Sequence, residues 1–157
     1  MKPVATLLIT LLFAPVLLAG RREVLVDDKA DFTRIKTFLI REGQATTTRP
    51  ELSNSLFLAN ISEAIRRQLS AKGLTESPDR PDVMVSFTIG QDRPHGPSVV
   101  FDRGTLVIEM IARESAASIW HGVYTDETSA PAKVAEKMPA NVQSLLSQFP
   151  PKRTKRP

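Results

Sequence analysis

Hydrophobic positions in the middle of the chain have the spacing of an amphipathic helix. Four of them recur at three- and four-residue intervals, which places them in one stripe on a helix. They are Leu58, Ile61, Ile65 and Leu69. Ser53 or Asn54 can cap the start of this helix. Lys72-Gly73 is typical of its end, because glycine readily adopts the left-handed conformation found there.

A second apolar stripe predicts a helix from about Pro131 to Gln148. Its members are Val134, Met138, Val142, Leu145, Leu146 and Phe149. Pro131 suits the first turn, where the backbone amide has no intrahelical partner. Pro139 lies in the interior, where it removes a hydrogen-bond donor at a cost of ~3 kcal/mol. We therefore expect a kink, or two short helices with Pro139 opening the second.

Stretches rich in apolar residues, the longer ones alternating, predict five strands. They span Val24–Val26, Lys36–Ile40, Asp82–Ile89, Thr105–Ala112 and Ser118–Tyr124. Successive side chains of a strand point to opposite faces, so Trp120 and His121 are expected on opposite faces, with Trp120 in the core. The polar stretch from Gln44 to Leu52 predicts a loop.

The order of these elements, β-β-α-β-β-β-α, predicts an α+β fold. We expect a two-layer sandwich in which two helices cover one face of a mixed five-stranded sheet. A right-handed crossover through the first helix makes the second and third strands parallel, and the last three strands form a meander. The uncovered face is expected to carry Met84, Ser86 and Thr88.

Residues 1–20 have the three parts of a secretory signal peptide: one basic residue, an apolar run and a small-residue end. We expect cleavage and export, which leaves residues 21–150 as a single domain in the periplasm or cell envelope. An uncleaved segment that anchors the chain in the inner membrane is the alternative. Leu18-Ala19-Gly20 is also the first part of a bacterial lipobox, but Arg21 stands where the lipidated cysteine belongs.

The composition of the chain excludes several kinds of site. The 157 residues suit one domain, and the absence of cysteine excludes disulfides, thiolate metal sites and a cysteine nucleophile. The net charge of +4 comes largely from residues 151–157, which hold four basic residues and are expected to form a disordered, solubilising tail. We therefore predict no nucleic-acid partner, and a membrane contact only if the N-terminal segment is uncleaved.

No pattern of residues predicts catalysis. A Gly-x-Ser-x-Gly turn and a glycine-rich phosphate loop are both absent from the sequence. We predict that the protein is not an enzyme and holds no cofactor or metal. The acidic residues Asp27, Asp28 and Asp31 lack the spacing of a calcium loop and are interpreted as part of a turn. Trp120-His121-Gly122 is interpreted as structural.

The segment 90–104 is the candidate binding loop, because it is long for a link between two strands. It carries Arg93, His95, Phe101, Asp102 and Arg103. We predict a non-enzymatic envelope module that binds an envelope protein or a cell-wall component through this loop or an unpaired sheet edge. The alternative is a small-ligand carrier or an enzyme with its site on the same loop. The sequence leaves the oligomeric state open.

Several short segments occur in the order and spacing of one bacterial family. They are Asp31-Phe32 with Lys36-Thr37-Phe38, Ala64-Ile65 with Leu69-Ser70-Ala71-Lys72-Gly73-Leu74, Pro81-Asp82-Val83-Met84-Val85, Gly104-Thr105-Leu106-Val107-Ile108, Ile119-Trp120-His121-Gly122 and Leu145-Leu146-Ser147-Gln148-Phe149-Pro150-Pro151. On these segments, the chain resembles domain-of-unknown-function (DUF) family 4136, found mostly as envelope lipoproteins.

This resemblance covers nearly the whole chain after the signal segment. It implies an exported envelope protein with an α+β fold, and it supplies no activity. Members commonly have the lipidated cysteine where this chain has Arg21, so the resemblance does not extend to an outer-membrane anchor. They also often have Asp where Glu109 and Ala112 stand, which weakens an acidic site at these positions.

Overall fold

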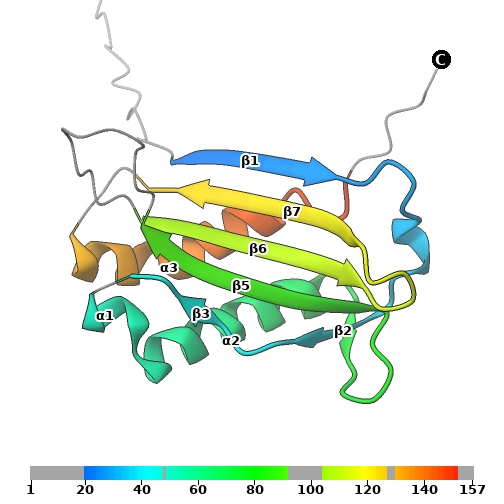
Figure 1. Ribbon diagram of the computed structural model, residues 1–157, viewed down its shortest axis with the longest axis horizontal. Coiled ribbons are helices and arrows are strands. Elements are labelled where there is room, and N and C mark those ends of the chain that lie inside the picture. Colours follow the sequence, from blue (N-terminus) through cyan, green and yellow to red (C-terminus); the bar gives the residue numbers. More distant parts are fainter. Residues whose placement is uncertain (1–19, 48, 92–103, 127–129, 152–157) are drawn as a thin grey trace, which may run out of the picture.

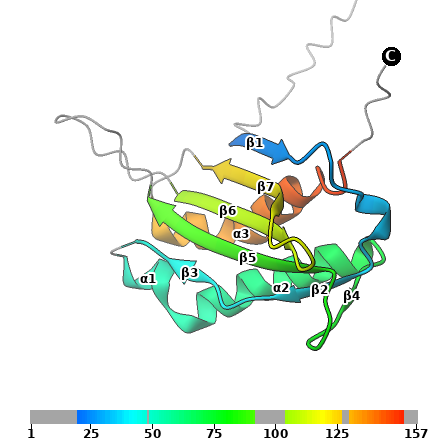
Figure 2. The same cartoon turned by 45° about the vertical axis from the view of Figure 1, so that its right-hand side comes forward.

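One sheet with helices on a single side makes up the protein (Figure 1; Figure 2). The computed structural model describes residues 20–47, 49–91, 104–126 and 130–151. The strands are β1 (Arg21–Val26), β2 (Thr37–Ile40), β3 (Gln44–Ala45), β4 (Thr75–Glu76), β5 (Val83–Gln91), β6 (Gly104–Ala112) and β7 (Ser118–Thr125). The helices are the short 3₁₀ turn η1 (Phe32–Arg34), α1 (Pro50–Ser53), α2 (Ser55–Ala71) and α3 (Pro131–Leu146).

The strands form a mixed sheet in the order β1-β7-β6-β5-β2-β4, and β3 pairs with β5 beside the end of β2. Strands β5, β6 and β7 make an antiparallel meander, and β1 pairs antiparallel with β7. Strands β2 and β5 are parallel, joined through α2. The predicted α+β class, the meander and the parallel pair are therefore confirmed.

The prediction of exactly five strands and two helices was wrong. Seven strands are present in the sheet, because β3 and β4 add two short pairings. Both β3 and α1 lie in Gln44–Leu52 or reach just beyond it, where we expected only a loop. These elements are two to four residues long, too short to show a period of hydrophobicity, so their polar sequences gave no signal.

Helix α2 confirms its predicted ends. Asn54 caps it, since the side-chain oxygen accepts a hydrogen bond from the Phe57 amide at 2.8 Å. At the other end, Gly73 has a φ of +85°, the left-handed conformation that ends a helix. The predicted stripe lies against the sheet: Ile61, Ile65 and Leu69 are buried, and Leu58 is partly buried.

Helix α3 is one continuous helix with Pro139 inside it, so the alternative of two short helices was wrong. Pro139 is exposed, and the hydrogen bond that it removes lies on the solvent side. The opposite side holds the helix against the sheet and α2. Its buried residues are Val134, Met138, Asn141, Val142, Leu145 and Leu146.

The core lies between the helices and one face of the sheet. Alternate residues of β5 are buried, as predicted: Val83, Val85, Phe87 and Ile89. The residues between them, among them Met84, Ser86 and Thr88, are only half-buried on the uncovered face. In the described parts of the chain, no helix combines the length and the apolar character needed to cross a membrane.

Trp120 is fully buried in this core, as expected. It is 0% exposed, and its ring meets that of Phe149 edge-to-face at 6.0 Å between centroids. Gly122 lies on the same face of β7, two residues along. A methyl group at Gly122 would overlap the Trp120 ring and approach a methyl carbon of Leu145 to 3.0 Å. The large ring of Trp120 therefore requires a residue without a side chain at position 122.

Replacing Gly122 by Ala is expected to lower the free energy of unfolding by about 2 kcal/mol, because the added methyl overpacks the core. Urea unfolding followed by the fluorescence of Trp120, the sole tryptophan, measures the loss. The neighbouring change His121→Ala, on the uncovered face, is expected to cost less than about 1 kcal/mol. Equal stability of Gly122→Ala and the wild type would contradict this account of the core.

Candidate functional site

The residues of the predicted binding loop, Arg93, His95, Phe101, Asp102 and Arg103, lie outside the described residues. The prediction for this loop therefore stays a prediction. The strands place its two ends, since β5 ends at Gln91 and β6 begins at Gly104. A polar concave surface of the described chain lies at the other end of these strands.

This surface is a cleft of about 880 Å³ at the end where β5 begins and β6 ends. Three connections form it: the turn and 3₁₀ helix after β1, the residues before β5, and the hairpin between β6 and β7. Its charged residues are Asp27, Lys29, Asp31, Arg34, Asp82, Arg113 and Glu114. Ile35, Val83, Ala112 and Ile119 supply apolar surface among them.

Two of the aspartates hold the backbone of the first connection. Asp27 accepts a hydrogen bond from the Lys29 amide at 2.9 Å. Asp31 caps η1, because its carboxylate accepts from the Thr33 amide at 3.1 Å and from the Thr33 hydroxyl at 2.6 Å. Their interpretation as part of a turn is confirmed by these contacts.

Asp82 joins two strands that are distant in sequence. One carboxylate oxygen accepts hydrogen bonds from the amides of Lys36 and Thr37, both at 2.8 Å, and from the Thr37 hydroxyl at 2.9 Å. The amide of Lys36 contributes most to lowering the pKa of Asp82 below its usual value, with Thr37 and the charge of Arg34 adding to the effect. Asp82 therefore stays ionised and fixes the start of β2 against the start of β5.

The basic residues of the cleft are differently placed. Lys29, Arg34 and Arg113 are exposed, and none has a carboxylate within ion-pair distance among the residues that the structure describes. They come from the turn after β1, from η1 and from the β6–β7 hairpin. The fold thus brings three cations from separate segments to one cleft while three of its four carboxylates bind backbone or hydroxyl groups.

A shallower depression of about 440 Å³ adjoins this cleft and shares Asp27 and Ile119 with it. Leu25, Ser118 and His121 are among its lining residues. Trp120 also borders it, but this residue is fully buried, so its indole is not open to a ligand there. The combined surface offers charged groups beside apolar ones.

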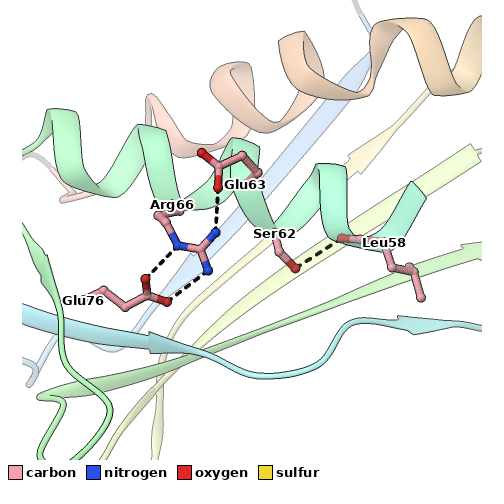
Figure 3. Close-up of polar contacts among 5 residues, drawn as sticks. All are labelled: Leu58, Ser62, Glu63, Arg66 and Glu76. Atoms are coloured by element: carbon pink, nitrogen blue, oxygen red, sulfur yellow. Dashed lines mark hydrogen bonds and ion pairs between the residues drawn. The ribbon is translucent and has the colours of Figure 1, made fainter. Parts of the chain in front are cut away.

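A second polar cluster, around Arg66, has a structural role (Figure 3). The guanidinium of Arg66 on α2 pairs in a bidentate manner with Glu76 on β4, at 2.7 and 3.2 Å, and contacts Glu63 at 2.7 Å. The hydrogen bond to Glu76 contributes most to raising the pKa of Arg66 further above its usual value. This pairing fixes the short edge strand β4 to α2.

On the uncovered sheet face, His121 and Glu109 are cross-strand neighbours, with 4.0 Å between Nδ1 and Oε1. Among the described residues, no group of three or more His, Asp or Glu side chains lies close enough to hold a metal ion.

At the end of β7, the buried Asp126 is 3.5 Å from the side-chain amide nitrogen of Asn141 and 4.0 Å from the ammonium of Lys137. This pair connects β7 to α3, and sequence reasoning missed it.

Sequence reasoning also missed the cleft. Its aspartates were noticed only as turn residues, and Arg34 and Arg113 were not singled out. These residues are about 80 positions apart, so no local pattern connects them. The one available signal was that polar turns follow β1 and β6, two strands that terminate at the same end of the sheet.

Comparison with known proteins assigns the chain to a family. The model of the family described as "Domain of unknown function (DUF4136)" matches residues 23–151. The chain belongs to the DUF4136 family. The predicted resemblance is thereby confirmed at the level of the family. No curated protein matches this DUF4136 member in sequence.

Three solved structures resemble the DUF4136 member. A DUF4136 family protein from Bacteroides thetaiotaomicron has 16% identity and a TM-score of 0.64, over 84% of this chain and 96% of that one. PelC from Paraburkholderia phytofirmans, a dodecamer, has 14% identity and a TM-score of 0.53, over 85% and 99%. A PDZ domain protein from Parabacteroides distasonis has 16% identity and a TM-score of 0.59, over 88% of this chain and 38% of that one. At these identities, the likeness shows the fold alone.

The contacts of Asp82 give a pH-dependent prediction. Replacing Asp82 by Asn is expected to lower the free energy of unfolding by about 1 kcal/mol at pH 7, because a charged acceptor of three hydrogen bonds is lost at an exposed site. The pKa of Asp82 is lowered by folding, so its contribution is complete above about pH 4 and is lost as the pH falls through the lowered pKa. The deficit should therefore shrink below about pH 4.

Urea unfolding at several pH values measures this deficit. Asp28→Asn is the matched control, since Asp28 is an exposed aspartate in the turn after β1 and has no hydrogen bond to another described residue. It should show no deficit at either pH. A deficit for Asp82→Asn that is the same at pH 3 and pH 7 would contradict the role given to the charge.

Proposed function

We propose that this DUF4136 member is an exported, non-enzymatic module of the cell envelope that binds a polypeptide segment of a partner protein in the cleft at the strand ends. The observation that carries the proposal is the convergence of Lys29, Arg34 and Arg113 at one cleft, with no carboxylate of the described residues within ion-pair distance of them. Such cations are available to carboxylates of a partner, and arginine can bind a carboxylate through two parallel hydrogen bonds.

The lining of the cleft favours a polypeptide over a small anion. Negative charge is also present, from Asp27, Asp31, Asp82 and Glu114. The ionised state of Asp82, set by the Lys36 and Thr37 amides, keeps a negative group there. Apolar side chains lie between the charges. A segment that carries side chains of both signs and an apolar residue is complementary to this mixture, whereas an isolated anion meets only part of it.

The rigid connection of the strand ends also supports a binding role. The Asp82 contacts hold β2 to β5, and the Arg113 amide donates to the Asp82 carbonyl at 3.0 Å, which adds the β6–β7 hairpin. The positions of Arg34 and Arg113 relative to each other are therefore set by backbone contacts. A site that is already ordered loses less conformational entropy when it binds.

Photo-crosslinking at the cleft tests whether a partner protein binds there. In the full chain, in cells, Ser115 is replaced by the photo-crosslinking residue p-benzoylphenylalanine. We expect a discrete crosslinked product whose yield falls severalfold when Arg34 and Arg113 are both changed to Ala, because the partner's carboxylates lose their binding groups. The matched control Arg67→Ala removes an exposed arginine of α2 that does not line the cleft, and it should leave the yield unchanged. A yield that is indifferent to both cleft arginines, or no product, would count against the proposed function.

The second prediction concerns export. Strand β1 begins at Arg21, directly after the predicted signal segment, which supports cleavage near this point without loss of a strand. We expect mass spectrometry of the chain from the periplasmic fraction to find an N-terminus near Arg21. A chain that retains Met1 in the inner membrane would support the anchored alternative, and one that retains it in the cytosol would contradict export.

A further inference from the structure

Strand β1 is the longer of the two edges of the sheet (Figure 1). It has six residues, whereas β4 at the other edge has two. In the described part of the chain, β7 is the one strand that pairs with β1. An edge strand of this length presents a row of backbone groups that can pair with another strand.

The antiparallel pairing tells which backbone groups face outward. The Asp27 amide donates to the Ile119 carbonyl of β7 at 3.0 Å. Because hydrogen-bonded and non-hydrogen-bonded residues alternate along an antiparallel strand, the odd-numbered residues of β1 bond toward β7. The amides and carbonyls of Arg22, Val24 and Val26 therefore point away from the sheet.

The second half of β1 lacks the charges that usually protect an edge. Arg21, Arg22 and Glu23 are charged, whereas Val24, Leu25 and Val26 are apolar. Leu25 is 70% exposed and lies on the uncovered face of the sheet. Only Leu56 on α2, at 71%, is a comparably exposed large apolar residue in the described chain. The second half of this edge therefore carries no charge that would oppose pairing with another strand.

We propose that the occupant of this edge is a second copy of the chain, with the two β1 strands antiparallel and Val24 facing Val24 of the other copy. In this register Arg21 lies opposite Asp27 and Glu23 lies opposite Leu25, each twice by symmetry. The pairing exchanges backbone hydrogen bonds at Arg22, Val24 and Val26, and it uses the whole strand.

Charge selects this register among its neighbours. A slip of one residue would place an uncovered-face residue opposite a helix-face residue, which the pleat forbids. Moving the symmetry axis one residue earlier sets Glu23 against Glu23. Moving it one residue later sets Glu23 against Asp27. Like charges directly opposite are destabilising, so the register centred on Val24 is favoured.

The helix layer leaves room for this pairing. Helix α3 packs over β6 and β7 rather than over the outer side of β1. The guanidinium of Arg22 donates to the carbonyl and the hydroxyl of Ser144, both at 3.2 Å, and is thereby held against α3. The paired sheets would be continuous, with the helices of both copies on the same side.

A crosslinking experiment tests the register, because the chain has no cysteine of its own. Full chains carrying Glu23→Cys and Leu25→Cys are mixed under mild oxidation. Facing residues of a non-hydrogen-bonded pair have Cα atoms about 4.5 Å apart, within the range of a disulfide. We expect the mixed dimer, identified by mass, to exceed the dimers formed by either variant alone. Leu56→Cys, equally exposed on α2, is the control and should give only background crosslinking. A mixed dimer at the level of that control would overturn the proposal.

Introducing a charge at Leu25 gives a second measurement, made on the cysteine-free chain. Sedimentation equilibrium should show a concentration-dependent dimer for the native protein. Leu25→Glu should abolish it, because the new carboxylate faces Glu23 of the other copy, whereas Leu25→Lys should preserve it. Circular dichroism verifies that both variants are folded. A native chain that stays monomeric at all concentrations, or equal loss of the dimer in both variants, would overturn the proposal. The substituted residues Glu23, Leu25 and Leu56 do not line the cleft, so this inference and the proposed function can fail separately.

Discussion

The structure depends on burying two apolar helix stripes against one face of the sheet. Most of the stability of amphipathic helices such as α2 and α3 comes from packing their apolar face against the rest of the protein. Strands β5, β6 and β7 supply the surface that both helices require, and Trp120 is fully buried in it. This layer positions the turns that form the cleft and the edge strand β1.

The longest elements could be predicted from the sequence because burial on one face leaves a regular record in the residues. Strand β5 alternates without interruption, and α2 has both a stripe and recognisable ends at Asn54 and Gly73. The short elements could not be predicted, because a pair such as Gln44–Ala45 has no period. Pro139 led to the wrong expectation of two short helices in place of α3. The sequence does not show that Pro139 faces solvent, where the loss of its hydrogen bond destabilises the helix less.

The cleft was not predictable for a different reason. Its residues are ordinary turn residues in their own segments, and only the return of β6 and β1 to the same end of the sheet brings Arg34 near Arg113. Asp82 illustrates the same limit. Its bonds to Lys36 and Thr37 span about 45 residues and depend on the parallel pairing of β2 with β5. Function that lies in such convergences becomes visible only in three dimensions.

The bidentate contact between Arg66 and Glu76 has a consequence for how large an assembly can become. It pins the two-residue strand β4 to α2 and leaves that end of the sheet with almost no backbone to offer. A molecule in which only one edge strand can pair forms a dimer and no larger assembly, because the dimer contact occupies that edge in both copies. The salt bridge that fixes β4 to α2 would thus favour a closed dimer over an open-ended fibre.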